Sequence, residues 1–545
     1  MFWHALLANR SLTDPHTWQV GGGTLLLIVA IHFVLFALPS GRWTIKPVLI
    51  LLALVSAAAA TYMQQYTVYF DTNMLRNVLH TQVGEARELV TLSMLTKVLA
   101  MAALPVAIIL WVKVTKRSWR RALGTRVAAS AAALVFATVG GLLAAQDLSS
   151  LLRNHKEARY LVTPANLIVA GLRVAGSDAR AAASVRLAVG EDARQRVLAG
   201  NQRPLLLVLV VGETVRAENW GLNGYQRQTT PNLSQLDVIN FPDVTACGTS
   251  TEVSLPCMFS ETGRRDYDEE RIRNSDSLLH VVSRAGISTL WIDNQTGCKG
   301  VCADLPNEQL PGDGDALLCN GEHCLDEMLV RRVAAQLDTS AQLDTSAQLN
   351  TSSTLDTSST LDAAPKLATL RGDTMIVLHP LGNHGPAYYL RYPPAFARFQ
   401  PGCESADLGD CSADQITNSY DNAVLYSDHW LAKMIALLQQ ARNYDSAMIY
   451  VSDHGESLGE LGLYLHGVPY AIAPKQQTQV PMVAWLSENL RSRVGLDPDC
   501  LRREAMQPAS HDNLYHSVLG LLDIETAVYE PKLDLFRNCR AINSG

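Results

Sequence analysis

The sequence lacks an excess of basic residues. Lys and Arg together number 45 against 52 Asp and Glu, which gives a formal net charge of -7 at pH 7. It also lacks a basic stripe of the kind that binds the phosphate backbone of nucleic acids. The composition therefore excludes nucleic-acid binding as the function.

Cysteine is absent from the first 246 residues, and all 10 cysteines lie in the remainder of the chain. No C-x-x-C repeat has zinc-ribbon or zinc-finger spacing, which argues against a cysteine-ligated metal. The cysteines instead fall in four pairs that are close in sequence and one long-range pair: Cys247 and Cys257, Cys298 and Cys302, Cys319 and Cys324, Cys403 and Cys411, Cys500 and Cys539. Cytosolic thiols are the alternative, but this pattern favours five disulfides in an oxidising compartment.

Long apolar runs dominate only residues 1–146. A chain of 545 residues is too long for one hydrophobic core, so at least two regions are expected. A helix that crosses a bilayer needs about 20 apolar residues. Four segments qualify: Gly22–Leu38, Pro47–Met63, Leu89–Val112 and Gly124–Gln146. One of them alone is compatible with a buried helix of a soluble protein, but four in succession predict a helical transmembrane domain.

The short connections between these segments give the orientation, because Lys and Arg concentrate in cytoplasmic loops. The connection from Lys113 to Arg121 carries five basic residues, and the first connection carries Arg42 and Lys46. Both are predicted to be cytoplasmic, so the loop 64–88 and everything after the fourth span face outward. The cysteines then lie on the oxidising side of the membrane.

This topology leaves the N-terminus outside. Met1–Arg10 is apolar but too short to span, and it lacks the basic start and cleavage site of a signal peptide. We therefore expect that a preceding membrane helix is missing, through either a late start or divergence.

Beyond a mixed bridging segment, residues 147–203, the sequence is typical of a soluble α/β domain, residues 204–545. Its first run, Pro204–Val211, is unbroken apolar sequence of the kind found in strands buried on both faces. Similar runs recur with helical patterns between them, at Ile287–Ile292, Thr374–Leu378, Ala447–Ser452 and Val480–Leu486. This alternation predicts an α/β fold with a mainly parallel sheet.

Residues 335–362 interrupt that pattern with a repeated hexapeptide related to AQLDTS. Its period is too short for a solenoid unit and its polarity is too high for a core. A lengthened surface loop is predicted, and we expect its copy number not to affect catalysis.

Polar side chains follow three of the predicted strands. Glu213 comes after the first, Asp453 and His454 come after the fourth, and the third ends at His379 and continues to His384. Active sites of parallel α/β sheets gather beyond the carboxyl ends of the strands. Two carboxylates and an imidazole suit zinc or manganese. We therefore expect Glu213, Asp453 and His454 to bind a metal ion.

The stretch CGTSTEVSLPC, between Cys247 and Cys257, offers Thr251 as a nucleophile. A metal-bound hydroxyl is far more acidic than a free one and can attack phosphorus at neutral pH. A helix start at which hydroxyls cap backbone amides is the alternative interpretation.

These residues resemble a known family, the phosphoethanolamine transferases that modify lipid A, including the mobile colistin-resistance enzymes. The matching blocks are VVGETVRAENWGLNGY, ACGTSTEVSLPCMF, HPLGNHGPAYYLRYP and VSDHGESLGELGLYLHGVP. The resemblance implies an alkaline-phosphatase-like or sulfatase-like catalytic domain in which Thr251 carries the phosphoethanolamine. It also implies zinc bound by Glu213, Thr251, Asp453 and His454.

By the same resemblance, His384 and His466 bind the substrate phosphate or a second zinc, and Lys299 contacts the substrate. Further residues in the outward loop, spaced by four, match family residues that line the lipid-donor site: Asn77, Thr81 and Glu85. A solvated helix face is the alternative interpretation of these three.

The implied reaction has two steps. Thr251 displaces diacylglycerol from phosphatidylethanolamine, and an acceptor phosphate or hydroxyl then attacks the phosphoethanolamine-threonine. Lipid A phosphate is the expected acceptor, which implies polymyxin resistance, and a core sugar or a periplasmic glucan stays open. The chain is expected to be a monomer of the bacterial inner membrane with its catalytic domain in the periplasm.

Enzymes of the same fold offer alternatives. A sulfatase needs a C-x-P-S-R type stretch to make formylglycine, and none is present at Thr251. A glycerol-phosphate transferase has a similar membrane domain, but the predicted disulfides and the GETVRAENWGLNGY block favour phosphoethanolamine. Glu252, directly after Thr251, is more acidic than the usual residue of the family. We expect its carboxylate to weaken the binding of an anionic substrate.

Overall fold

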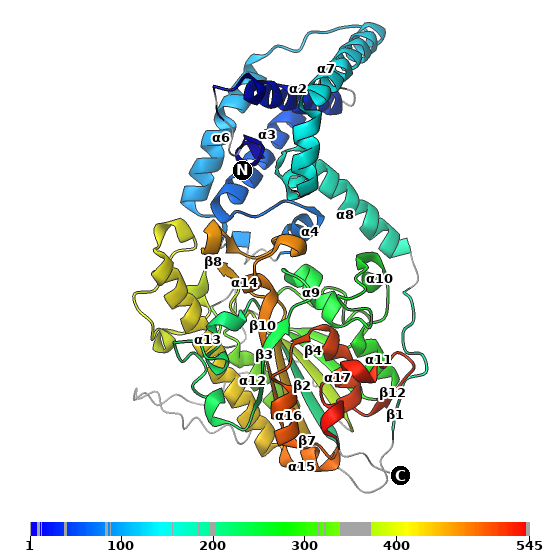
Figure 1. The fold of residues 1–545 in the computed structure, drawn as a ribbon, viewed down its shortest axis with the longest axis vertical. Helices are drawn as coiled ribbons and strands as arrows, with labels where there is room; N and C mark the ends of the chain where they lie inside the picture. The colour runs from blue at the N-terminus through cyan, green and yellow to red at the C-terminus, as the bar shows by residue number, and fades with distance from the viewer. Residues whose placement is uncertain are drawn as a thin grey trace. The chain divides into compact units, whose positions relative to one another are not determined.

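The computed structural model describes residues 2–7, 11, 13–37, 41–81, 86–87, 89–154, 156–183, 186–196, 203–310, 312, 315, 317–320, 323–337 and 372–540. Residues 338–362, most of the hexapeptide repeat, and Glu85 of the outward loop lie outside this part. The chain forms two compact units, whose helices and strands are labelled in Figure 1. One unit contains residues 1–79 and 90–179, and the other contains residues 80–89 and 180–545.

The first unit contains four helices that are long and apolar enough to cross a membrane, as the sequence predicts. They are α2 (Pro15–Ala37), α3 (Ile45–Tyr66), α6 (Leu92–Trp111) and α7 (Trp119–Asn154). Helices α2 and α7 pack closely because glycines face each other. A Cβ added at Gly140 would lie 2.5 Å from the carbonyl oxygen of Gly23. Small residues permit such close packing of helices in lipid.

The helix ends differ from the predicted spans, and the two largest differences are at the start of α2 and the end of α7. Helix α2 begins at Pro15, since proline fits the first turn of a helix. Helix α7 continues past Gln146 to Asn154, and Leu151 in its extension packs with Val20 in a small core of this unit. Packing within the unit, rather than the end of the apolar run, therefore decides where α7 stops.

Shorter helices complete this unit. They are α1 (Phe2–Leu7), α4 (Thr72–His80), η1 (Lys156–Leu161) and α8 (Ala165–Ala183). The guanidinium of Arg76 on α4 donates to Asp178 on α8 at 3.2 Å, and its side chain is buried. The segment expected to bridge the two domains is thus largely helical.

An eight-stranded sheet forms the centre of the second unit, in the order β11-β3-β10-β7-β2-β6-β4-β5. The strands are β2 (Leu205–Gly212), β3 (Ile239–Thr245), β4 (Ser288–Asp293), β5 (Asn307–Gln309), β6 (Thr374–His379), β7 (Asp445–Ser452), β10 (Gln479–Leu486) and β11 (Ala509–Ser510). Only β10 runs antiparallel to its neighbours, which are β3 and β7. All five predicted strands are present, and the mainly parallel sheet is confirmed.

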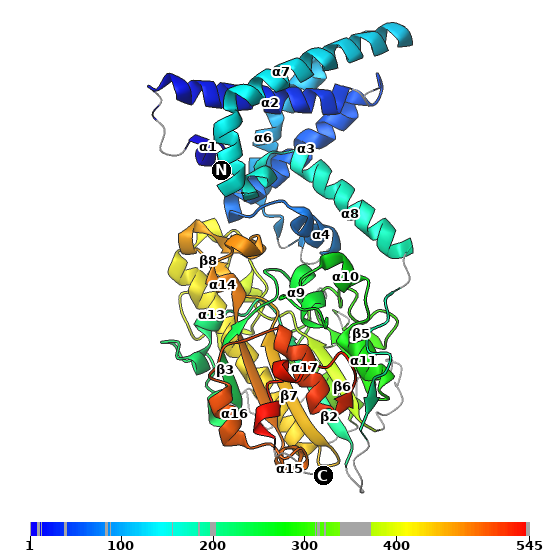
Figure 2. The ribbon, with the colours of Figure 1, turned by 45° about the vertical axis from the view of Figure 1, so that its right-hand side comes forward.

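Helices cover both faces of this sheet (Figure 2). Leu207 and Leu209 of β2 belong to a core shared with α11 (Leu278–Arg284) and α17 (Asp512–Leu521). Helix α13 (Ala413–Gln440) lies on the other face, where it contacts β7, and α12 (Glu327–Gln336) packs against α13. Strands β2, β6 and β7 are buried along their whole length, which accounts for their unbroken apolar sequences.

All five expected cysteine pairs form disulfides in this unit: Cys247–Cys257, Cys298–Cys302, Cys319–Cys324, Cys403–Cys411 and Cys500–Cys539. The first of them closes the segment that contains Thr251.

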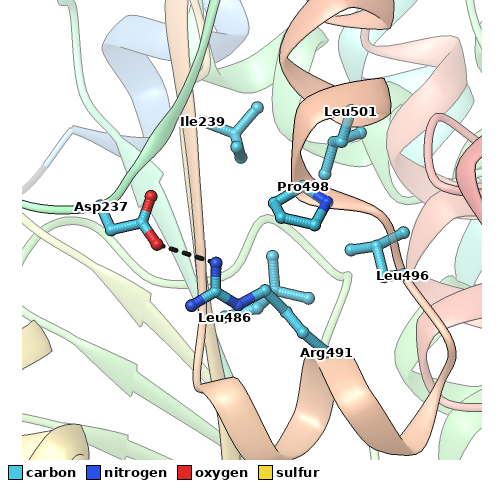
Figure 3. A pocket seen from close by; sticks show the side chains of 7 residues that line it. All are labelled: Asp237, Ile239, Leu486, Arg491, Leu496, Pro498 and Leu501. Atoms are coloured by element: carbon cyan, nitrogen blue, oxygen red, sulfur yellow. Dashed lines mark hydrogen bonds and ion pairs between the residues drawn. The ribbon is translucent and has the colours of Figure 1, made fainter.

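A small pocket lies at one edge of the sheet, beside the start of β3 and the end of β10 (Figure 3). Its wall is mainly apolar, and Asp237 accepts a hydrogen bond from Arg491 at 2.8 Å beside it. Leu486 of β10 pairs with Ala447 near the start of β7. The pocket is therefore at the edge opposite the carboxyl ends of β2 and β7.

Candidate active site

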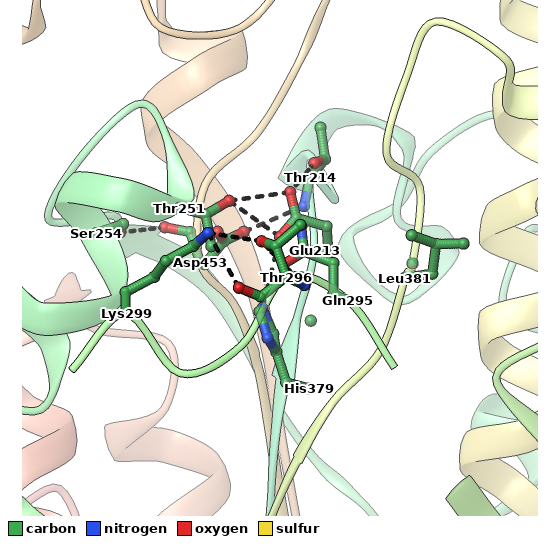
Figure 4. A network of polar contacts seen from close by, with 12 residues as sticks. Glu213, Thr214, Thr251, Ser254, Gln295, Thr296, Lys299, His379, Leu381 and Asp453 are labelled. Carbon is green, nitrogen blue, oxygen red and sulfur yellow. Dashed lines mark hydrogen bonds and ion pairs between the residues drawn. The ribbon is translucent and has the colours of Figure 1, made fainter. Parts of the chain in front are cut away.

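Two adjacent strands deliver the expected metal ligands to one edge of the sheet (Figure 4). Strands β2 and β7 are parallel, and Gly212 at the end of β2 pairs with Ser452 at the end of β7. Glu213, Asp453 and His454 follow directly and are fully buried. Their ligand atoms lie within 4.8 Å of one another. The register of the two strands thus brings the three side chains together.

Thr251 is the first residue of helix α9 (Thr251–Met258). Its Oγ1 lies 3.2 and 3.1 Å from the two carboxylate oxygens of Glu213 and 3.4 Å from His454 Nε2. Ser250 holds the N-cap position, so the Thr251 hydroxyl is directed to the carboxylate rather than to the helix amides. This arrangement argues against a purely capping role for Thr251.

The donor atoms fit a divalent metal ion. His454 Nδ1 lies 2.8 Å from the carbonyl oxygen of Gly455, which keeps the proton on Nδ1 and leaves the lone pair of Nε2 facing the two carboxylates. Burial lowers the pKa of His454 to about 3, and the charge of His466 contributes to the shift. The imidazole is therefore neutral, as metal binding requires. Asp453 Oδ2 is buried and accepts no hydrogen bond within the described part of the chain.

The carboxylates of Glu213 and Asp453 repel each other when both are ionised. Burial raises the pKa of Asp453 well above its ordinary value, and the charge of Glu213 raises it further. Burial also disfavours the charged form of Glu213, but the positively charged imidazole of His379, 3.7 Å from its carboxylate, lowers its pKa. Buried charges of one sign are costly unless an opposite charge accompanies them. A cation held between these carboxylates would stabilise both ionised forms.

A residue pair behind Glu213 is absent from the predicted site. His379, the last residue of β6, places Nε2 3.7 Å from Glu213 Oε2 and Nδ1 3.0 Å from Asp293, the last residue of β4. Burial favours the neutral imidazole, but Asp293 raises the pKa of His379 to about 10. Trp291 Nε1 also donates to Asp293, at 2.9 Å. Such histidine–carboxylate pairs orient metal ligands. Their only sequence signal is a polar residue at the end of an apolar strand.

His384 and His466 lie close to the candidate metal ligands. The ring of His466 is 4.5 Å from that of His454 and 5.5 Å from that of His384, measured between centroids. His466 Nδ1 lies 3.3 Å from a carboxylate oxygen of the buried Glu456. Burial favours the neutral form, but Glu456 raises the pKa of His466 to about 9. His466 therefore keeps a proton at neutral pH.

The remaining predicted contacts come from two segments. The Lys299 side chain points toward Thr251 and Glu213 (Figure 4), and its Nζ donates to Thr296 Oγ1 at 2.6 Å. Asn77 lies on α4 in the first unit, and Thr81 directly follows that helix. With Glu85 outside the described residues, a donor site formed by these three stays a prediction.

Comparison with known proteins identifies the family. A model of the phosphoethanolamine transferases EptA/EptB matches residues 28–179, and a sulfatase model matches residues 206–524. Phosphoethanolamine transferase EptA of Escherichia coli (strain K12) is 37% identical over 546 residues, which cover 99% of this chain and 94% of the relative. The chain belongs to the EptA/EptB phosphoethanolamine transferase family.

Two further proteins are similar to this phosphoethanolamine transferase. Phosphatidylethanolamine transferase Mcr-1 of Escherichia coli is 35% identical over 514 residues, which cover 92% of this chain and 87% of the relative. The integral membrane protein lipooligosaccharide phosphoethanolamine transferase A of Neisseria meningitidis superposes with a TM-score of 0.87 at 34% identity, covering 99% of this chain and 95% of that one. The predicted activity, sulfatase-like fold and inner-membrane location with a periplasmic catalytic domain are confirmed.

Two side chains of the transferase tie the start of α9 to the end of β7. The Ser254 hydroxyl donates to the carbonyl oxygen of Asp453. His511 Nδ1 accepts the N–H of Cys247 at 3.0 Å, and its Nε2 donates to the carbonyl oxygen of Ser452 at 2.9 Å. Burial lowers the pKa of His511 to about 4, so the imidazole is neutral and plays both roles. His511 precedes α17, and its sequence gives no sign of this contact.

We expect His511→Ala to impair the transferase in both stability and turnover. The change leaves two buried backbone groups without partners, which costs about 2 to 5 kcal/mol and lowers the melting temperature by about 5 °C or more. Loss of the link should also misplace Thr251 and reduce kcat roughly tenfold. Thermal unfolding and turnover of the purified full chain test both effects.

His516→Ala on α17 is the matched control, because His516 is also buried and accepts the N–H of Glu530 at 3.1 Å. It should lower the melting temperature but preserve kcat below that temperature. Equal losses of kcat in the two variants would contradict a specific role of His511.

Proposed function

We propose that this enzyme transfers phosphoethanolamine from phosphatidylethanolamine to a phosphate of lipid A through a phosphoethanolamine-threonine at Thr251. The observation that carries the proposal is the position of Thr251 Oγ1, which lies 3.1 to 3.4 Å from Glu213 and His454. The relative Mcr-1 is named a phosphatidylethanolamine transferase, which supports phosphatidylethanolamine as the donor. The Neisseria meningitidis enzyme is named a lipooligosaccharide phosphoethanolamine transferase, which supports a lipid-linked saccharide as the class of acceptor.

We further propose zinc as the metal, held by Glu213, Thr251, Asp453 and His454. Two carboxylates and a neutral imidazole are common zinc donors, and a hydroxyl supplies the fourth position. When bound, zinc supplies a Lewis acid that lowers the pKa of the Thr251 hydroxyl.

In the first step, the Thr251 hydroxyl gives its proton to the Glu213 carboxylate to which it donates, Oγ1 attacks the phosphorus of phosphatidylethanolamine, and the bond from phosphorus to the diacylglycerol oxygen breaks. Glu213 fixes the direction of the attacking hydroxyl through its hydrogen bond. His466 is the proposed donor of the proton that the leaving oxygen takes, since Glu456 keeps its imidazole protonated. Lys299 would offset the negative charge that develops on the phosphoryl oxygens.

In the second step, a lipid A phosphate hydroxyl returns a proton to His466, and its oxygen attacks the phosphorus of the phosphoethanolamine-threonine. The bond from phosphorus to Thr251 Oγ1 breaks, Oγ1 takes back its proton from Glu213, and the threonine is regenerated for the next cycle. The side chains that oriented the first displacement serve the second, because both pass through the same phosphoryl group.

Mass spectrometry of lipid A tests the acceptor and the nucleophile together. Cells that express the wild type should show a phosphoethanolamine increment on lipid A, and cells that express Thr251→Ala should not. Survival in polymyxin should rise in the first strain only. An increment in neither strain would reject lipid A as acceptor, and an increment in both would reject Thr251 as nucleophile.

A further inference from the structure

The carboxylate beside the nucleophile does not face solvent. Glu252 follows Thr251 on α9, and its side chain is only 1% exposed. Its Oε1 lies 3.0 Å from Nη2 of Arg273, and the same guanidinium nitrogen donates to the carbonyl oxygen of Glu252 at 2.6 Å. The positive charge of Arg273 therefore opposes the repulsion that Glu252 is expected to exert on an anionic substrate.

Arg273 is held in place from its own helix, α10 (Glu269–Arg273). Its Nε donates to Glu269 at 3.2 Å, one turn earlier. An arginine fixed at two points presents its guanidinium in one orientation, so less side-chain entropy is lost when it binds Glu252. The contact between α9 and α10 is thus polar and directed.

The second oxygen of Glu252 faces the lysine that is proposed to contact substrate. Lys299 Nζ lies 4.0 Å from Glu252 Oε2, and the Lys299 side chain is 4% exposed. Nδ1 of His80, in the same unit, lies 3.4 Å from the same oxygen. One carboxylate thus lies between two cations, and the three groups together carry one net positive charge. The phosphodiester of the donor carries one negative charge, so this balance favours its approach to Thr251.

We propose that Glu252 and Arg273 are positioning residues that hold Lys299 beside Thr251 and set the charge that the donor phosphate meets. The role presupposes the proposed function of Thr251 and Lys299. Arg273 forms an ion pair with Glu252, so Lys299 stays able to interact with the phosphoryl group. Without Arg273, the buried carboxylate is left with Lys299 and His80 as neighbours, and the charges of Glu252 and Lys299 sum to zero.

This arrangement predicts a specific pattern of rescue. Arg273→Gln should lower kcat/KM about tenfold, mainly through KM for the donor, because one partner of a buried ion pair is left unmatched. Glu252→Gln in the same chain removes the unmatched charge, and the double variant should return to within about threefold of the wild type. Arg273→Lys should retain more activity than Arg273→Gln.

The experiment uses the purified full chain in detergent, with a fluorescent phosphatidylethanolamine as donor and release of its diacylglycerol as readout. Arg265→Gln is the matched control, since Arg265 pairs with Glu530 in the same unit at 2.7 Å but contacts none of the three groups. It should leave kcat and KM unchanged. Thermal unfolding is recorded for every variant.

Failure of Glu252→Gln to restore the Arg273→Gln enzyme would overturn the proposal and indicate a structural arginine. Unchanged kinetics of Arg273→Gln would also overturn it. Thr251→Ala measured in parallel separates this inference from the proposed function. An active Thr251→Ala enzyme would refute Thr251 as the nucleophile. If Thr251→Ala is inactive and Glu252→Gln fails to rescue Arg273→Gln, only the positioning role of Glu252 and Arg273 is refuted.

Discussion

Thr251→Ala is expected to reduce phosphoethanolamine transfer by at least about 1,000-fold, because loss of a catalytic nucleophile removes the covalent route altogether. Thr251 Oγ1 contacts both Glu213 and His454. Alanine keeps the backbone of the α9 helix start but offers no atom that can attack phosphorus. Thr251→Ser retains the hydroxyl and should keep a measurable part of the activity.

The covalent intermediate gives a more direct measurement. The wild type, incubated with phosphatidylethanolamine and no acceptor, should gain one phosphoethanolamine on the peptide that contains Thr251. Thr251→Ala should gain none. Thr214 is the side chain to examine in the same spectra, because its hydroxyl also bonds to Glu213. An adduct on Thr214, or on any residue of the alanine variant, would contradict the assignment of Thr251.

The cluster of candidate metal ligands could be predicted because its residues follow strands with simple sequences. Strands β2 and β7 are buried on both faces, so their apolar runs end abruptly, and the first polar residues after them are Glu213 and Asp453. Parallel neighbours in register place such residues side by side. Thr251 could also be predicted, because it lies in a hydroxyl-rich segment between Cys247 and Cys257, which form a disulfide.

The supporting residues depend on strand order and packing, which no local pattern encodes. Asp293 reaches His379 only because β4 lies beside β6. His511 contacts the nucleophile segment from the end of the chain, 264 positions beyond Cys247. The antiparallel direction of β10 could not be predicted from the sequence for a related reason. A strand buried on both faces has the same composition whether it runs parallel or antiparallel.

Glu252 shows how a correct observation can lead to an incomplete expectation. Its charge beside Thr251 is visible in the sequence, but its partner Arg273 lies 21 positions away on another helix. The effect of a buried carboxylate on an anionic substrate depends on the net charge of its surroundings, not on the residue alone. Under the proposed positioning role, the contact with Arg273 offsets the repulsion that the sequence predicts at this position.

Asp453→Asn is expected to remove most of the bound zinc and to lower transfer by at least about 100-fold, since even losses behind the ligand shell cost 10- to 100-fold. The change preserves the shape of the side chain. It replaces a charged donor by a neutral amide, a far weaker ligand, in a fully buried position beside His454 Nε2. Elemental analysis of the purified full chain measures the zinc independently of activity.

Asp421→Asn is the matched control for this change. Asp421 is also fully buried in the catalytic domain, but it binds Asn219, Tyr225 and Arg227 and takes no part in the metal site. Its loss should lower the melting temperature, because a buried ion pair with Arg227 is weakened, and should leave the zinc content unchanged. Full zinc content in Asp453→Asn, or equal zinc loss in the two variants, would show that Asp453 is not a ligand. Zinc loss confined to Asp453→Asn would tie the metal to the side chains that orient Thr251.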